Sequence, residues 1–328
     1  MKALVTGGAG FIGYHLVKHL LEKDCEVTAC DDFFRGRRDD DFATLSEHGN
    51  FRFESVDLTD ATALRRLPND FDIIYHLAAI NGTRYFYEIP AQVLRVNILS
   101  TINLLDWMTR TSCRKLIIMS SSEAYAGTMS TVGLPVPTPE AVPLTVSDVL
   151  NPRFSYAGSK IAGELLAVNY GRTHGIQTAV IRPHNIYGPR MGYEHVIPEF
   201  LMRIINRENP FRIHGGRQSR AFCHVSDFVQ AMESLAHTPC PTDRPLIMNI
   251  GNDREEITIP ELADKMFDMF NFHPEMKVNP VPEGSVDRRC PDISLARAVL
   301  GYEPQVDLET GLRDTYEWYR KHPEKRHE

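Results

Sequence analysis

A tyrosine and a lysine stand four residues apart in the stretch Ser155-Tyr-Ala-Gly-Ser-Lys160. On a helix this spacing puts the phenol of Tyr156 and the ammonium of Lys160 one turn apart on the same face. A cation that close stabilises a phenolate and lowers the tyrosine pKa from about 10 towards neutrality. The pair is therefore a candidate general acid and base for a substrate hydroxyl.

Three hydroxyl groups and a carboxylate follow one another in Met119-Ser-Ser-Ser-Glu-Ala-Tyr125, directly after an apolar run that is typical of a strand. Such side chains are poor core material, but they are good hydrogen-bond partners for a polyol substrate. Ser121, Ser122 and Glu123 are therefore candidates for a site where this strand ends. For Glu123 an alternative stays open, in which its carboxylate caps the turn after the strand.

The chain opens with a short apolar run, residues 2–6, which breaks into a glycine cluster and continues at helical spacing. This order predicts a strand, a tight loop and a helix. Gly7 allows the sharp turn, Gly10 lets the backbone approach a pyrophosphate, and Gly13 lets the helix lie close to the strand. The phosphates would bind the free N–H groups at the helix N-terminus. The pattern is that of a dinucleotide-binding site.

Tyr14 and Lys18 have the same spacing as Tyr156 and Lys160, so position has to decide between the two pairs. Tyr14 lies on the predicted pyrophosphate-binding helix, whose far turns face away from the nicotinamide. Tyr156 begins the helix that follows the fifth predicted strand. The second pair is therefore the predicted acid–base pair.

A second predicted strand ends in Asp31, 24 positions after Gly7. A carboxylate there can accept both hydroxyls of an adenosine ribose and repels a 2′-phosphate, which favours NAD over NADP. Arg35, Arg37 and Arg38 follow closely and could neutralise such a phosphate. They stand beside acidic residues, however, as in a solvated mixture of charges. The sequence therefore predicts NAD as the cofactor.

Strands and helices alternate through the first half of the chain. Strands are predicted at 2–6, 26–31, 51–56, 72–77, 115–120 and 177–182, and helices near 11–23, 60–67, 90–111 and 154–174. This alternation predicts an α/β fold with a doubly wound parallel sheet, the Rossmann fold. We expect residues 1–182 to form mainly an NAD-binding domain and 183–328 mainly a smaller C-terminal substrate-binding lobe, with segments that can return to the sheet.

The composition is that of an ordinary soluble globular protein, with 42% hydrophobic and 24% charged residues. A net charge of −7 provides no basic face for nucleic acid or an anionic membrane. No apolar run approaches the ~20 residues of a membrane helix, and no signal peptide precedes the first strand. The six cysteines show no metal or redox spacing, so we expect no metal site and a cytoplasmic protein with reduced thiols.

Together these motifs resemble the extended short-chain dehydrogenase/reductase family of NAD-dependent nucleotide-sugar epimerases, dehydratases and decarboxylases, over nearly the whole chain. The cofactor-binding residues that the resemblance implies are Gly7, Gly10, Phe11, Ile12, Gly13, Asp31, Asp32, Asp57, Leu58, Leu77, Ala78, Ala79, Tyr156 and Lys160. The implied catalytic residues are Ser121, Glu123, Tyr156 and Lys160. The implied substrate-binding residues are Ser122, Arg153, Asn185, Arg220 and Arg289, with residues 182–189 as a diphosphate-binding loop.

Within the family, four stretches resemble UDP-glucuronate decarboxylases most. Asp31-Asp-Phe-Phe-Arg-Gly-Arg37 is similar to their Asp-Asn-Phe-Phe-Thr-Gly-Arg, and Ser120-Ser-Ser-Glu123 to their Ser-Thr-Ser-Glu. Pro152-Arg-Phe-Ser-Tyr156 is similar to their Pro-Arg-x-x-Tyr, and the C-terminal Arg289-Cys-Pro-Asp-Ile to their Arg-Lys-Pro-Asp-Ile. The resemblance implies a nucleotide sugar, most simply a UDP-sugar, as the substrate.

By this resemblance the enzyme oxidises C4 of a nucleotide-linked hexose with NAD. Tyr156, helped by Lys160, takes the hydroxyl proton while Ser121 holds the oxygen. With a C6 carboxylate the ketone is a β-keto acid that loses CO2, with a C6 hydroxyl it permits loss of water, and otherwise it is reduced from the other face. UDP-glucuronate decarboxylation is the favoured hypothesis. C4-epimerisation of UDP-glucuronate or UDP-glucose and 4,6-dehydration are the alternatives, with a non-catalytic NAD-binding regulatory module as a remote one.

The predicted helices near 90–111 and 154–174 carry apolar residues on more than one face. Members of the resembled family pair these two helices across a four-helix interface. We therefore expect a homodimer.

Overall fold

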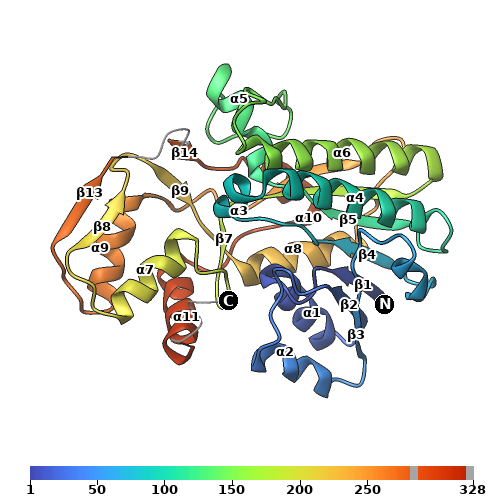
Figure 1. The fold of residues 1–328 in the computed structure, drawn as a ribbon, viewed down its shortest axis with the longest axis horizontal. Helices are drawn as coiled ribbons and strands as arrows, with labels where there is room; N and C mark the ends of the chain where they lie inside the picture. Colours follow the sequence, from blue (N-terminus) through green and yellow to red (C-terminus); the bar gives the residue numbers. More distant parts are fainter. Residues whose placement is uncertain (281–286, 323–328) are drawn as a thin grey trace.

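A seven-stranded parallel sheet organises the structure, a computed structural model that describes residues 1–280 and 287–322 (Figure 1). From one edge to the other the strand order is β11-β6-β5-β4-β1-β2-β3. The strands are β1 (Lys2–Thr6), β2 (Glu26–Asp31), β3 (Phe51–Ser55), β4 (Ile73–His76), β5 (Lys115–Met119), β6 (Gln177–Pro183) and β11 (Leu246–Ile250). All neighbours pair in parallel, which confirms the predicted doubly wound α/β fold.

Helices cover both faces of the sheet, and successive strand residues alternate between two cores. Ala3 and Val5 of β1 belong to the core formed with α1 (Phe11–Glu22) and α8 (Val225–His237). Leu4, between them, belongs to the core formed with α4 (Pro90–Met108) and α6 (Phe154–His174). A strand that is buried on both faces has apolar residues at successive positions, which is why these strands appear in the sequence as continuous apolar runs.

The sheet changes direction between β1 and β4. From β1 the chain proceeds to β2 and β3 on one side, and then crosses back to β4 on the other side. Loops that leave the C-terminal ends of these two strands diverge, so a crevice forms between them where ligands of such sheets bind. The glycine loop follows β1 and residues 77–82 follow β4, which brings both to this crevice.

The C-terminal half of the chain contributes to the sheet as well as to a smaller lobe. β11 pairs with β6, while α8 and α10 (Ser294–Leu300) pack on the same core as α1. The lobe comprises α7 (Val196–Ile205), β8 (Phe211–His214), β9 (Ser219–Ala221), β12 (Glu256–Thr258), α9 (Ile259–Met269), β13 (Met276–Asn279), β14 (Arg288–Arg289) and α11 (Leu308–Lys321). The lobe has its own core. In Figure 1 it lies on the left, whereas α4, α6 and the N-terminus lie on the right.

Some elements differ from the sequence predictions. The helix expected near 60–67 is only a short 3-10 turn, Ala63–Arg66. Asp60 accepts hydrogen bonds from the backbone and hydroxyl of Thr62 just before it, and such local bonds compete with a helix. Three short helices, α2 (Asp40–Thr44), α3 (Thr83–Glu88) and α5 (Ala126–Thr131), were not predicted. None of the helices in the described ranges combines the length and hydropathy that a bilayer crossing requires.

Candidate active site

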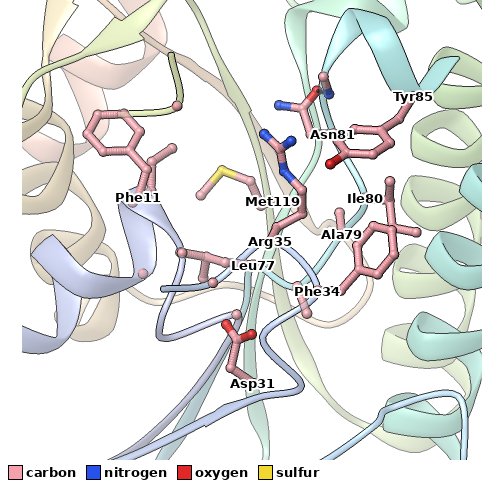
Figure 2. Close-up of a pocket in the computed structure, with 18 of the residues that line it drawn as sticks. Phe11, Asp31, Phe34, Arg35, Leu77, Ala79, Ile80, Asn81, Tyr85 and Met119 are labelled. Atoms are coloured by element: carbon pink, nitrogen blue, oxygen red, sulfur yellow. Dashed lines mark hydrogen bonds between the residues drawn. The ribbon is translucent and has the colours of Figure 1, made fainter. Parts of the chain in front are cut away.

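A cavity of about 1380 Å³ lies along the C-terminal edge of the sheet at this crevice (Figure 2). This volume exceeds the usual range for one small ligand, so it can hold a dinucleotide beside a second molecule. All the predicted cofactor-binding and catalytic residues line it: Gly7, Gly10, Phe11, Ile12, Gly13, Asp31, Asp32, Asp57, Leu58, Leu77, Ala78, Ala79, Ser121, Glu123, Tyr156 and Lys160. The predicted substrate-binding residues Ser122, Asn185 and Arg289 line it as well.

The glycine loop borders the cavity at the N-terminus of α1. Gly7 has a φ of 70°, and a Cβ at Gly13 would lie 2.0 Å from the carbonyl oxygen of Gly7, so neither position tolerates a side chain. Gly10 precedes α1, and no side chain caps this helix. The first N–H groups of a helix lack intrahelical partners and bind anions well. The loop therefore fits the pyrophosphate of NAD.

Arg190 fixes the glycine loop from the C-terminal half of the chain. Its guanidinium donates to the carbonyl oxygens of Ala9 (3.0 Å) and Gly10 (3.2 Å), and it forms a buried ion pair with Asp39 (2.8 Å). The same guanidinium lies 4.5 Å from the ring centroid of Tyr14, which is packed in the core and does not line the cavity. Arg190 was not among the predicted site residues, because nothing in the sequence nearby indicates this distant contact.

Asp31 is the acidic residue at the adenosine end of the predicted cofactor site. Its carboxylate accepts hydrogen bonds from the backbone N–H groups of Ala9 (3.1 Å) and Phe33 (2.7 Å). Burial raises the pKa of Asp31, and the two hydrogen bonds oppose this shift. Asp32 and Asp57 are exposed, and each accepts a backbone N–H from two residues further on. These carboxylates fit the ribose of a dinucleotide without providing a partner for a 2′-phosphate.

Tyr156 and Lys160 lie in the first turns of α6, beside the end of β5. The Lys160 ammonium is 5.6 Å from the ring centroid of Tyr156 and donates to the carbonyl oxygen of Met119 (2.9 Å). Ser121 lies close enough to the Tyr156 hydroxyl to lower its pKa, and the ring of Phe86 stacks on the tyrosine ring at 4.7 Å. The structure thus brings three predicted catalytic residues together, and it adds Phe86, which the sequence analysis did not single out.

The expected lowering of the tyrosine pKa is not found. Burial raises the pKa of Tyr156 and outweighs the effect of Ser121, which lowers it. Burial also lowers the pKa of Lys160 to about 8, although the carboxylate of Glu164 opposes this shift. The prediction considered only the neighbouring cation, whereas the low-polarity surroundings disfavour both charged forms.

Glu123 lies between two guanidinium groups beside Tyr156. Its carboxylate is 2.5 Å from Arg289 and 3.2 Å from Arg153, and all three side chains are largely buried. Burial alone would raise the pKa of Glu123, but Arg289 and Arg153 hold it below its usual value, so the group is ionised. The turn after β5 is capped by the Ser121 side chain, which accepts the N–H of Glu123. The capping alternative for Glu123 is therefore wrong.

Arg153 and Arg220 do not line the main cavity. Arg153 reaches it only through Glu123, while Arg220 lines an adjoining cavity of about 320 Å³ in the C-terminal lobe. Asn185 lines both cavities, so they adjoin at this residue. Burial lowers the pKa of Arg220 to about 10, and the charge of Arg289 contributes. The two cavities together suit an anionic ligand that extends from Tyr156 into the lobe.

Arg182 departs from the predicted role of residues 182–189 in diphosphate binding. It is buried on β6, where it forms a bidentate ion pair with Glu164 (2.8 and 2.7 Å) and donates to the hydroxyl of Tyr125 (2.7 Å). Glu164 in turn accepts a hydrogen bond from Ser120, next to Ser121. Arg182 therefore supports the base of the site and does not reach the cavity, whereas Asn185 of the same loop does.

Comparisons with known proteins agree with this architecture. The model of the NAD dependent epimerase/dehydratase family matches residues 3–251. UDP-glucuronic acid decarboxylase 5 of Arabidopsis thaliana is 33% identical, over 95% of this chain and 87% of the relative. UDP-glucuronic acid 4-epimerase from Bacillus cereus, solved with UDP-glucuronic acid and NAD, is 26% identical in sequence. Its structure superposes with a TM-score of 0.85, and the match covers 98% of this chain and 99% of the epimerase chain. DesIV, a dTDP-glucose 4,6-dehydratase from Streptomyces venezuelae solved with NAD, is 27% identical in sequence and has a TM-score of 0.86. The match covers 98% of this chain and 97% of the dehydratase chain.

Proposed function

The chain belongs to the NAD-dependent epimerase/dehydratase family, and we propose that within it this enzyme decarboxylates UDP-glucuronate through a 4-keto intermediate. Curated relatives with 30–33% identity over at least 95% of this chain bear the name UDP-glucuronic acid decarboxylase. Each of the four sequence stretches that resemble these enzymes contributes at least one residue to the lining of the main cavity. NAD fits the uncapped N-terminus of α1 and the carboxylate of Asp31.

The observation that carries the proposal is a cluster of guanidinium groups beside Tyr156. Arg289 lines the main cavity and pairs with Glu123, which also pairs with Arg153. Arg220 lines the adjoining cavity, close enough for the charges of Arg289, Glu123 and Arg153 to shift its pKa. Guanidinium groups bind carboxylates and phosphates well, so these residues suit a sugar with a C6 carboxylate and the diphosphate that links the sugar to its nucleoside.

The residues of the site fit the chemistry of such a substrate. NAD, when bound, accepts hydride from C4 of the sugar. Tyr156 takes the proton of the C4 hydroxyl, while Ser121, which lies beside the Tyr156 hydroxyl, holds the oxygen. Arg289, which lines the cavity, holds the C6 carboxylate, which is then β to the C4 ketone. The C5–C6 bond breaks with loss of CO2, its electron pair moves to the C4 oxygen as an enolate, and a proton returns to C5.

NMR of a reaction mixture with labelled UDP-glucuronate and NAD tests the proposal. We expect labelled CO2 and a pentose or 4-keto-pentose nucleotide. Glu123→Gln should oxidise C4 but stall at the next step, so that bound NADH absorbance persists, because Arg153 and Arg289 lose the carboxylate between them. Glu88→Gln, on the exposed surface of α3, is the matched control and should react as the wild type does.

C4-epimerisation is the second candidate function, because the solved epimerase with 26% identity binds the same acidic sugar. Recovery of UDP-galacturonate with no CO2 would replace the decarboxylase proposal with this one. Formation of a 4-keto-6-deoxy product from a neutral nucleotide hexose, with UDP-glucuronate untouched, would instead indicate a dehydratase.

Two further properties complete the proposal. The protein is a homodimer, which the exposed apolar residues of α4 and α6, Leu94 and Leu165, support. It resides in the cytoplasm, which is supported by six cysteines that are all buried and unpaired, as in a reducing compartment.

A further inference from the structure

Arg35 extends across the cavity from the loop that follows β2. Figure 2 shows its side chain in the middle of the pocket, with Met119 on one side and Asn81 and Tyr85 on the other. The guanidinium carbon lies 4.9 Å from the ring centroid of Tyr85. A guanidinium that stacks on an aromatic ring still presents its N–H groups at its edges, where they can donate to an anion.

The backbone on each side of Arg35 is held in place. The N–H of Phe33 donates to the carboxylate of Asp31 (2.7 Å), and the N–H of Arg37 donates to the carbonyl oxygen of Ala9 (3.1 Å). Gly36 lies so close to Asp31 that a Cβ there would be 2.7 Å from the carboxylate. The backbone of Arg35 is therefore held in place beside Asp31, the candidate ribose-binding residue.

Two glycines lie beside the guanidinium, on different walls of the cavity. A Cβ at Gly82 would lie 3.5 Å from Nη1 of Arg35, and a Cβ at Gly192 would lie 3.5 Å from Nη2. Gly82 belongs to the loop after β4, whereas Gly192 belongs to residues 188–195 of the C-terminal half. Arg35 therefore bridges the groove from the β2 loop to both of these walls.

Arg35 forms no ion pair within the described part of the chain, whereas Arg84 nearby is paired with Glu88 (2.8 Å). A Cβ at Gly82 would also lie 3.5 Å from the carboxylate of Glu194, which is therefore near the guanidinium without pairing with it. Burial lowers the pKa of His195 to about 4, and the charge of Arg35 contributes to this shift. A half-buried guanidinium in this state suits an anionic ligand in the cavity.

We propose that Arg35 is a latch over the diphosphate of bound NAD and slows release of the cofactor. The groove offers this anion two positive ends, since α1 begins without a capping side chain on one side and Arg35 crosses on the other. Asp31 places the adjoining ribose beside the latch. The UDP-glucuronate decarboxylases that the chain resembles have threonine at this position, so the latch distinguishes this chain from them. The proposal rests on NAD binding and not on the identity of the sugar.

The rate of NADH release tests the latch. It is measured as the loss of NADH fluorescence when the binary complex is mixed with excess NAD. Arg35→Thr should speed release at least tenfold. The release rate of Arg35→Lys should lie between those of the wild type and Arg35→Thr. An ammonium keeps the charge but loses the planar fork and the stacking on Tyr85. Added salt should accelerate release from the wild type more steeply than from Arg35→Thr.

Arg52→Thr is the matched control, because Arg52 is 61% exposed, is paired with Glu54 and does not line the cavity. It should release NADH at the wild-type rate. A wild-type release rate for Arg35→Thr, with an increase only in the KM for the UDP-sugar, would assign the guanidinium to the substrate and overturn the proposal. Equal acceleration by Arg52→Thr would reduce the effect to net charge and would also overturn it. Neither result depends on whether UDP-glucuronate is decarboxylated.

Discussion

Burial shifts the pKa values of Tyr156 and Lys160 in opposite directions, because one group becomes charged when it loses a proton and the other when it gains one. The phenol therefore holds its proton more tightly, and the ammonium holds its proton less tightly. Positive charge near the phenol opposes the first shift, and Arg35 contributes to this. The electrostatics of the whole cavity thus set the reactivity of Tyr156, in addition to the neighbouring lysine.

Tyr156→Phe should abolish hydride transfer from the sugar, since it removes the proton acceptor while leaving the ring stacked on Phe86. Binding of NAD should change by no more than a few-fold. Single-turnover absorbance at the NADH band measures the first effect, and fluorescence titration measures the second. Tyr14→Phe is the control, because Tyr14 has the same spacing from a lysine but is packed beneath Arg190. An active Tyr156→Phe protein would place the acid–base group elsewhere.

Lys160→Met should stabilise the folded protein at pH 7 while it lowers kcat. The folded-state pKa of Lys160 is about 8, against an ordinary value of 10.5, so folding must keep a proton on a buried amine below pH 8. This lowers the free energy of unfolding by ~3 kcal/mol, a penalty that Lys160→Met removes. The variant also loses the hydrogen bond to Met119, which is worth ~1 kcal/mol. The gain should therefore be about 2 kcal/mol at pH 7 and should shrink as the pH rises from 8 to 10.5. Urea unfolding of both proteins at pH 7 and at pH 10.5 measures the difference. A Lys160→Met protein that is less stable than the wild type at pH 7 would contradict the prediction.

At the level of elements, the sequence predicts the sheet and the helices beside it well, because strands such as β1 are buried on both faces and α1 follows a glycine loop. It predicts poorly where distant segments complete the site. The long-range contact of Arg190 has no local pattern, and Arg182 is turned inward by its buried partner Glu164. The pKa of Tyr156 likewise depends on burial that only the folded chain provides.

Arg190→Met should destabilise the protein by about 3–5 kcal/mol, because it breaks the buried ion pair between Arg190 and Asp39. NAD affinity should also fall, since the carbonyl oxygens of Ala9 and Gly10 are no longer held. Denaturant unfolding and NAD titration measure the two effects. Arg190→Met combined with Asp39→Asn should recover most of the stability but not the affinity. Recovery of both would show that Arg190 has no role in fixing the glycine loop.

For the whole molecule, we expect a homodimer of about 75 kDa formed across α4 and α6, twice the chain mass of 37.3 kDa. Leu165 of α6 is 61% exposed and Leu94 of α4 is 41% exposed, which suits burial against a second copy. Leu165→Glu should give monomers in sedimentation experiments at micromolar concentration. Val278→Glu, at a 54% exposed position on the lobe strand β13, is the control and should stay dimeric. A wild-type protein that sediments only as a monomer would refute the dimer.

The return of β11 to the edge of the sheet limits how this protein could be recombined with its relatives. A chimera that joined residues 1–182 to a foreign lobe would leave the hydrogen-bonding edge of β6 without β11, and the core around α1 without α8 and α10. An exchange of substrate specificity would therefore have to replace the lobe segments piecemeal and keep residues 225–250 and 294–300 from the host. The C-terminal lobe is thus built from segments that interrupt the sheet-forming chain, and it is not a separable module.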